Sequence, residues 1–258
     1  MSLIITYISK HGIVHASDSN LTNKTDTTEG KKTFDIPYLK AGLTYSGDYH
    51  IDGKTADAFI SEFITEQKNN PDITIKLFAS ELMDRIQRNI RQEEIKGGII
   101  IHIAGFIEIN SLSYPTFYHI SNVGLQEDGN YSKPVAEFHS SEDFLERDCP
   151  KYNLLKIFHV DDRIYQIYVN GYPPGRISYM ALRHVLHSAL SLIWSNPAWK
   201  FRPPCDIEES KAFVELYMRF MNILFQSSDF NLKYIGGPPQ VLAIASPDNL
   251  SEDCCNST

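Results

Sequence analysis

The chain has 258 residues, 42% of them hydrophobic, and a formal net charge of −8 at pH 7. This length fits one large domain with a sizeable core, and the acidic balance argues against nucleic acid or an anionic membrane as the main partner, because both attract basic patches. The apolar opening ends at Ser9-Lys10-His11, too early for a transmembrane span, and no export signal is recognisable. We therefore expect a cytoplasmic protein that binds neither nucleic acid nor membrane.

Neither the cysteines nor the histidines are spaced as metal ligands. The four cysteines match no zinc pattern and predict free thiols in a reducing compartment: Cys149, Cys205, Cys254 and Cys255. His184 and His187 lie three positions apart on an expected helix, but no third ligand is near them in the sequence. We expect no metal and no cofactor.

Hydrophobic periodicity divides the chain into alternating groups of strands and helices. Residues 3–16, rich in Ile, Val and Tyr and broken at His11-Gly12, are typical of a hairpin. Further strands are expected at 32–36, 41–46, 99–109, 116–121, 154–160, 163–169 and 240–245. Helices are expected from Ala56 to Ile64, from Pro71 to Gly97, and over residues 182–193 and 213–225.

This order of strands, two helices, strands, two helices and a strand suits two sheets face to face with helices outside. We therefore expect an α+β fold, a four-layer α-β-β-α sandwich. One domain is expected over residues 1–246, followed by a disordered tail over 247–258.

The second residue carries the first chemical signal. Removal of Met1, which a small second residue generally permits, would leave a free α-amine and a hydroxyl together on Ser2. A Ser hydroxyl is a weak nucleophile that needs an adjacent base. An α-amine with an ordinary pKa of about 8 can serve as that base.

Three short motifs follow in order. The segment Gly12-Ile-Val-His-Ala-Ser-Asp18-Ser is followed by Gly30-Lys-Lys-Thr-Phe-Asp-Ile, and then by Leu-Thr-Tyr-Ser-Gly47. Together with the N-terminal serine, these motifs resemble the active-site strands of proteasome β-type subunits, which are N-terminal nucleophile hydrolases.

The resemblance implies a role for each matching residue. It makes Ser2 the nucleophile, Asp18 the active-site acid, Lys32 the active-site lysine and Gly47 the oxyanion donor through its N–H. More loosely, Gly236-Gly237 resembles the family's glycine pair before the last strand, and Asp229 matches an Asp that assists the N-terminal amine. The resemblance also implies a peptide or amide substrate and a homo-oligomer, either a dimer or a ring; an ATPase partner cannot be read from these residues.

Two departures from the family pattern keep other functions open. The family's Gly-Ser-Gly-Ser turn is replaced here by residues 171–175, Gly-Tyr-Pro-Pro-Gly, and a family serine is replaced by Leu232. The leading hypothesis is a proteasome-like peptidase that uses Ser2. The alternatives are a non-catalytic assembly subunit and an acylase that hydrolyses small amides.

Overall fold

The computed structural model describes residues 2–22, 27–47, 50–90, 98–123, 137–142, 144, 158–159, 164–171, 188, 192, 202–226 and 236–248. Within these ranges the strands form two main sheets, and no helix combines the length and the apolar character needed to cross a membrane.

The first sheet contains both ends of the described chain. Its order is β12-β1-β2-β13, all antiparallel, with bounds β1 (Leu3–Ser9), β2 (Gly12–Ser17), β12 (Tyr165–Gly171) and β13 (Gln240–Ala245). β1 and β2 are buried along their whole length, as expected for strands rich in Ile and Val in the middle of a covered sheet. The expected hairpin at His11-Gly12 and the expected last strand are confirmed.

The second sheet has the order β11-β10-β9-β6-β5, also antiparallel. Its strands are β5 (Thr33–Ile36), β6 (Ala41–Gly47), β9 (Ile99–Ile109), β10 (Leu112–Ser121) and β11 (His139–Glu142). The short 3-10 helix η1 (Pro37–Leu39) joins β5 to β6. Two small ribbons pair β3 (Asn20–Thr22) with β4 (Thr27–Glu29), and β7 (His50–Ile51) with β8 (Lys54–Thr55).

The two main sheets pack against each other through aromatic and apolar side chains. The ring of Phe117 on β10 stacks on Tyr168 of β12, with centroids 3.8 Å apart. Ile8 and Ile13 of the first sheet lie in the same buried cluster as Ala104 of the second. This contact is what brings residues of one sheet within reach of the other.

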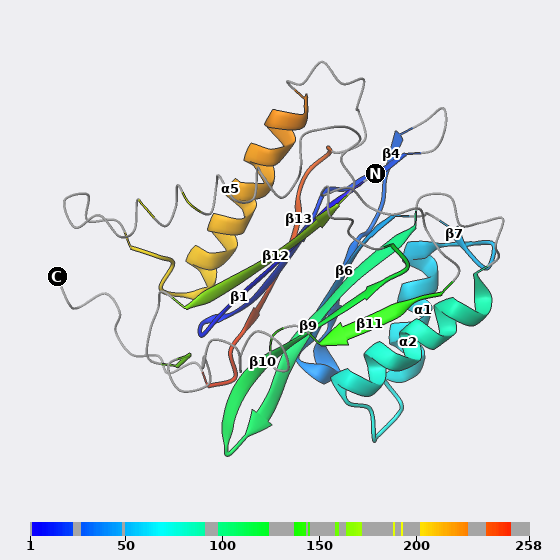
Figure 1. Cartoon of the computed structure of the whole chain (residues 1–258), viewed down its shortest axis with the longest axis horizontal. Helices are drawn as coiled ribbons and strands as arrows, with labels where there is room; N and C mark the ends of the chain where they lie inside the picture. Colours follow the sequence, from blue (N-terminus) through cyan, green and yellow to red (C-terminus); the bar gives the residue numbers. More distant parts are fainter. Residues whose placement is uncertain are drawn as a thin grey trace.

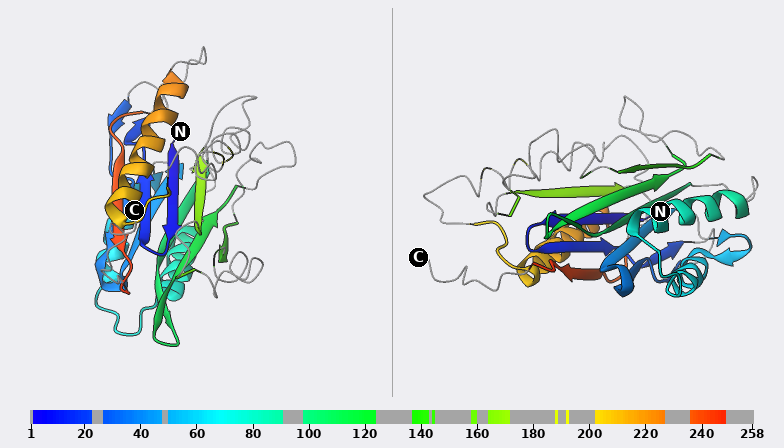
Figure 2. Two further views of the ribbon diagram at one scale, coloured as in Figure 1. Left: turned by 90° about the vertical axis from the view of Figure 1, so that its left-hand side faces the viewer. Right: turned by 90° about the horizontal axis from the view of Figure 1, so that it is seen from below.

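Among the described residues, three α-helices accompany these sheets. Figures 1 and 2 show α5 (Ile207–Gln226) beside the strands of the first sheet, and α1 (Ala56–Gln67) and α2 (Ile75–Asn89) beside those of the second. α2 begins at Ile75 instead of the expected Pro71, because the side chain of Thr74 caps it by accepting a hydrogen bond of 3.2 Å from Leu77 N.

The expectation of an α+β four-layer α-β-β-α sandwich is wrong. The described residues are 43% strand, arranged in several antiparallel sheets, and contain only three α-helices, where the expected fold needed a pair of helices over each sheet. Periodicity underestimated the strands, because the ribbons β3–β4 and β7–β8 are too short and polar to show a pattern. Most of the expected helix at 182–193 and most of the expected strand at 154–160 lie outside the described residues.

Part of the expected tail is also described. Ser113, in β10, donates hydrogen bonds from its backbone N–H and from its hydroxyl to the carboxylate of Asp248. Residues 249–258 lie outside the described residues.

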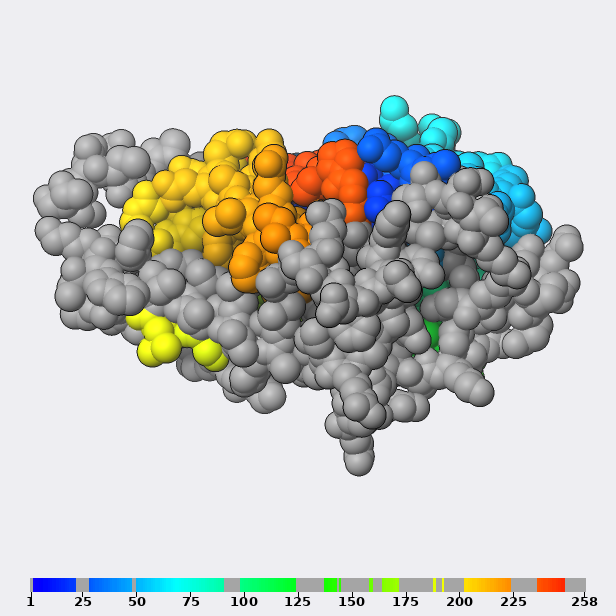
Figure 3. Space-filling model, turned by 90° about the horizontal axis from the view of Figure 1, so that it is seen from above, coloured from blue at the N-terminus to red at the C-terminus, as the bar shows by residue number. Residues whose placement is uncertain are grey.

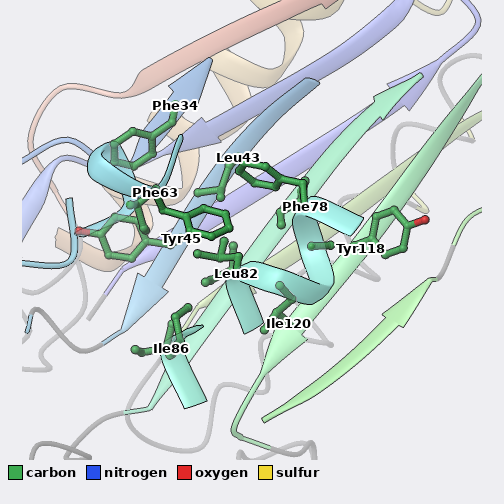
Figure 4. Close-up of a cluster of buried hydrophobic side chains, with 14 of the residues drawn as sticks. Phe34, Leu43, Tyr45, Phe63, Phe78, Leu82, Ile86, Tyr118 and Ile120 are labelled. Carbon is green, nitrogen blue, oxygen red and sulfur yellow. The ribbon is translucent and has the colours of Figure 1, made fainter. Parts of the chain in front are cut away.

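The largest apolar cluster lies between α1, α2 and the second sheet. Figure 4 shows side chains of α2, including Phe78, Leu82 and Ile86, pointing towards those of the sheet. Phe63 of α1 meets Phe78 edge to face, with ring centroids 5.0 Å apart. This cluster anchors β6 and β9, and β6 leads to Gly47.

We predict that Phe78→Ala lowers the free energy of unfolding by about 3–5 kcal/mol, because it removes a fully buried ring and leaves a cavity. Urea unfolding followed by circular dichroism measures this. Leu77→Ala, at the neighbouring exposed position, is the control and should cost no more than about 0.5 kcal/mol. Equal losses in the two variants would show that α2 does not pack through Phe78.

Candidate active site

Ser2 lies directly before β1 and is buried, with 3% of its surface exposed. The next residue, Leu3, forms two hydrogen bonds with Asp18, the residue that follows β2. Leu3 N donates to Asp18 Oδ1 over 2.8 Å, and Asp18 N donates to Leu3 O over 3.2 Å. Because β1 also pairs with β12 on its other side, the start of this strand has little freedom to move, and Ser2 is held in place.

The ammonium group of Lys32 lies against Ser2. Its Nζ donates to Ser2 Oγ over 2.7 Å and to Asp18 Oδ2 over 3.1 Å, and it also donates to the carbonyl oxygen of Asn20. A lysine ammonium has three N–H donors, and all three are used here. The structure therefore brings together three of the five predicted site residues, Ser2, Asp18 and Lys32.

Burial opposes both charges of this ion pair. The side chains of Lys32 and Asp18 are only 1% and 0% exposed. Loss of solvent lowers the pKa of Lys32 and raises that of Asp18, and the attraction between the two groups opposes each shift. A lysine whose pKa is lowered beside a hydroxyl is suited to exchange a proton with it or to stabilise its alkoxide.

Gly47 is the last residue of β6 and follows Ser46, which contacts Ser2. It has a φ of 124°, and an added Cβ would lie 1.9 Å from the carbonyl oxygen of Gly98, so only glycine fits here. Its neighbour Ser46 donates from its hydroxyl to the carbonyl oxygen of Ser2 over 3.3 Å. The structure thus places Gly47 one residue from a direct contact with Ser2.

One of the two loosely matched glycines, Gly237, has a packing role. A Cβ at Gly237, whose φ is 75°, would lie 2.3 Å from Ser19 Oγ and 2.8 Å from Asn20 Oδ1. This glycine lets the chain before β13 approach the loop whose carbonyl binds Lys32. The fifth predicted residue, Asp229, lies outside the described residues.

Sequence reasoning missed three contacts of the site. Lys32 Nζ donates to the carbonyl of Asn20, and the hydroxyl of Ser46 donates to the carbonyl of Ser2. The side chain of Gln240 accepts from the backbone N–H of Lys32. Ser46 stands next to a predicted residue, which is a weak signal. A backbone carbonyl and a lone glutamine have no sequence pattern that would have identified them.

A separate polar network lies between the sheets. Thr6 Oγ1 is 3.0 Å from Nδ1 of both His15 and His102, and His102 Nε2 is 2.7 Å from Asn170 Oδ1. With both imidazoles neutral, one chain of donors fits these contacts: His15 donates to Thr6, Thr6 to His102, and His102 to Asn170. Burial lowers the pKa of His15 to about 4 and that of His102 well below its usual value.

One group of metal-ligating side chains occurs among the described residues, at the start of α5, and comprises Cys205, Asp206 and Glu209. Its members already have partners. Glu209 binds Arg202 through two hydrogen bonds of 2.6 and 2.7 Å and accepts from Cys205 N, while Asp206 caps the helix by accepting from Glu209 N. Burial raises the pKa of the Cys205 thiol to about 11, so it is protonated at neutral pH. We assign no metal to this group.

Comparisons with known proteins do not extend this picture. No protein-family model matches the chain, and a search of curated proteins finds no significant relative. The functional argument therefore depends on the geometry of the site and on the motifs that carry its residues.

We predict that Asp18→Asn destabilises the protein by about 3–5 kcal/mol, because it leaves the Lys32 ammonium buried without its counter-charge. The control is Glu62→Gln, which breaks the exposed pair between Lys54 and Glu62 and should cost less than about 1 kcal/mol. Urea unfolding at pH 7 compares the two variants. A loss for Asp18→Asn as small as that for Glu62→Gln would contradict a buried ion pair.

We also predict that acid destabilises the protein through His15. Its pKa is about 4 in the folded protein against 6.5 for the ordinary group, so the unfolded chain takes up the proton first. The free energy of unfolding should therefore fall as the pH falls from about 6.5 towards 4, with His15 contributing about 2 kcal/mol by pH 5.

Urea unfolding at pH 7 and pH 5 tests this, with His15→Gln expected to lose about 2 kcal/mol less between the two pH values than the wild type. The exposed His139, changed to Gln, controls for the removal of any histidine. An unchanged pH dependence in His15→Gln would mean that another group causes the acid sensitivity.

Proposed function

We propose that the chain is an N-terminal nucleophile amidohydrolase in which Ser2, freed by removal of Met1, attacks an amide carbonyl. The observation that carries the proposal is the 2.7 Å contact between Ser2 Oγ and the buried Nζ of Lys32. The match of the surrounding motifs to active-site strands of proteasome β-type subunits supports it. The proposal includes a peptide or amide substrate, a cytoplasmic location and a homo-oligomeric assembly.

The first half of the reaction uses groups on Ser2 and Lys32. The free α-amine of Ser2 accepts the hydroxyl proton, directly or through one water, while the Lys32 ammonium stabilises the negative charge that develops on Oγ. Oγ then bonds to the carbonyl carbon of the substrate. Asp18 holds Lys32 in place and offsets its buried charge.

The tetrahedral intermediate needs hydrogen-bond donors for its oxyanion. We assign this role to the backbone N–H of Gly47, and the loss of one such donor typically slows a reaction by about 10²–10³-fold. The proton on the α-amine passes to the leaving nitrogen as the C–N bond breaks, which leaves an ester on Ser2. Water, deprotonated by the same amine, then cleaves the ester and restores the hydroxyl.

The test compares Ser2→Ala with the wild type, using hydrolysis of fluorogenic peptides, labelling by a β-lactone probe and the intact mass of the purified protein. We expect the wild type to lack Met1 and to carry the probe on residue 2. Ser2→Ala should hydrolyse the peptides at least about 10³-fold more slowly than the wild type. Lys32→Met should also lose labelling, because no cation remains beside Oγ.

Ser9→Ala is the matched control, since Ser9 is an equally buried serine at the far end of β1. It should keep the wild-type rate. Retention of Met1 together with an unlabelled Ser2, or equal background rates in the wild type and Ser2→Ala, would overturn the proposal and favour a non-catalytic assembly subunit.

A further inference from the structure

Gln240 connects the last strand of the first sheet to the backbone of the active-site lysine. It is the first residue of β13 and pairs with Ser17 of β2. Its Oε1 accepts from Lys32 N over 2.8 Å and from Thr33 N over 3.2 Å, and its Nε2 donates to Gly30 O over 2.5 Å. One carboxamide thus binds the backbone at three positions around Lys32, at residues 30, 32 and 33.

The bound segment needs such support. Residues 31–32 precede β5 and belong to no strand, so Lys32 N has no partner in the sheet ladder. On its other side the Lys32 carbonyl accepts from Tyr45 N over 3.0 Å, which ties it to β6. Gln240, from the first sheet, therefore supplies the hydrogen-bond acceptor for Lys32 N that the strands of the second sheet do not provide.

A neighbouring contact strengthens this junction between the sheets. Ser17, the residue opposite Gln240 in the strand pair, lies with its Oγ 2.9 Å from Thr33 Oγ1, which is in turn 3.3 Å from Thr44 Oγ1. Paired positions of β2 and β13 thus both hold the Lys32–Thr33 segment. In Figure 3 the surface of β13, in red-orange, adjoins that of the N-terminal strands, in blue.

We propose that Gln240 is a positioning residue: it fixes the backbone of Lys32 so that Nζ lies between Ser2 Oγ and Asp18. This inference rests on the proposed function, because the position of Nζ matters for the reaction only if Ser2 is the nucleophile. Gln240 touches no reacting atom and acts through Lys32. Nζ can meet its three acceptors together only while Cα lies within reach of all of them, and a misplacement of about 1 Å can cost about 10²-fold in rate.

Two variants and a matched control test the inference in the full-length protein. Gln240→Met keeps the size of the side chain and removes all three hydrogen bonds. Gln240→Glu keeps oxygen acceptors for Lys32 N and Thr33 N, and replaces the donor to Gly30 with a charged carboxylate oxygen. The control is Gln87→Met on α2, which removes a similar bond from a glutamine Oε1 to the backbone N–H of Phe138, 2.7 Å long, away from the site.

The first measurement is the rate of Ser2 acylation by the β-lactone probe, with the thermal midpoint of each variant recorded so that rates are compared on folded protein. We expect Gln240→Met to slow acylation by about 10–100-fold, Gln240→Glu to recover most of that loss and Gln87→Met to stay within about twofold of the wild type. In peptide hydrolysis the loss should fall on kcat and leave KM unchanged, because Gln240 does not contact substrate.

The second measurement does not depend on activity. A buried ammonium with three acceptors exchanges its protons slowly, so Lys32 should give a resolved ¹H–¹⁵N signal in protein labelled at lysine. We expect this signal to weaken or shift in Gln240→Met and to persist in Gln87→Met, with hydrogen exchange at the amides of Lys32 and Thr33 faster only in Gln240→Met.

The two measurements separate failure of this inference from failure of the proposed function. Normal acylation and an unchanged Lys32 signal in folded Gln240→Met would overturn the positioning role and leave the hydrolase intact. If the wild type is not acylated, the proposed hydrolase function is ruled out. The Lys32 signal would still decide whether Gln240 holds the ammonium in place.

Discussion

The structure depends on one buried charge, the ammonium of Lys32. A lysine withdrawn from water is costly unless every donor finds an acceptor and a counter-charge is near. The three acceptors come from three places in the chain: the residue before β1, the residue after β2 and the carbonyl at the start of β3. These segments must converge on one point, and this requirement fixes how the beginning of the chain enters the fold.

The sheets supply the rigidity that this convergence needs. Lys32 leads into β5 of the second sheet, whereas Ser2 and Asp18 flank β1 and β2 of the first, so the ion pair crosses from one sheet to the other. Any sliding of one sheet over the other would separate its members. Close aromatic stacking between Phe117 and Tyr168, and the hydroxyl contacts of Thr6 with His102, resist such sliding in the same interface.

Predictions from the sequence were correct where a short local pattern of residues determines the structure. A segment rich in Ile, Val and Tyr and broken at His11-Gly12 predicted the first hairpin, and a short motif around each of Asp18 and Lys32 led to residues that the structure brings together. The predicted fold class is wrong, because periodicity gave a pair of helices for each sheet, whereas the described residues are 43% strand and contain α1, α2 and α5. Sequence reasoning also failed for Gln240, which contacts Lys32 across 208 positions of sequence, since a side chain bound to backbone groups needs no motif at either end.

Burial strengthens the interactions inside the site, and under the proposed function the same physical effect would make the site reactive. In water, an ammonium beside a Ser hydroxyl would be solvated and neither group would perturb the other strongly. With solvent removed, the Lys32 charge acts at short range on Ser2 Oγ, while the cost of burying that charge lowers its pKa. Asp18 opposes this shift and so favours the charged form of Lys32, which under the proposed function would stabilise the Ser2 alkoxide. A pair that served only stability would need the carboxylate and further neutral acceptors of any kind. The proposed function accounts for a serine hydroxyl in the place of one of those acceptors, because it puts a nucleophilic oxygen beside the Lys32 charge.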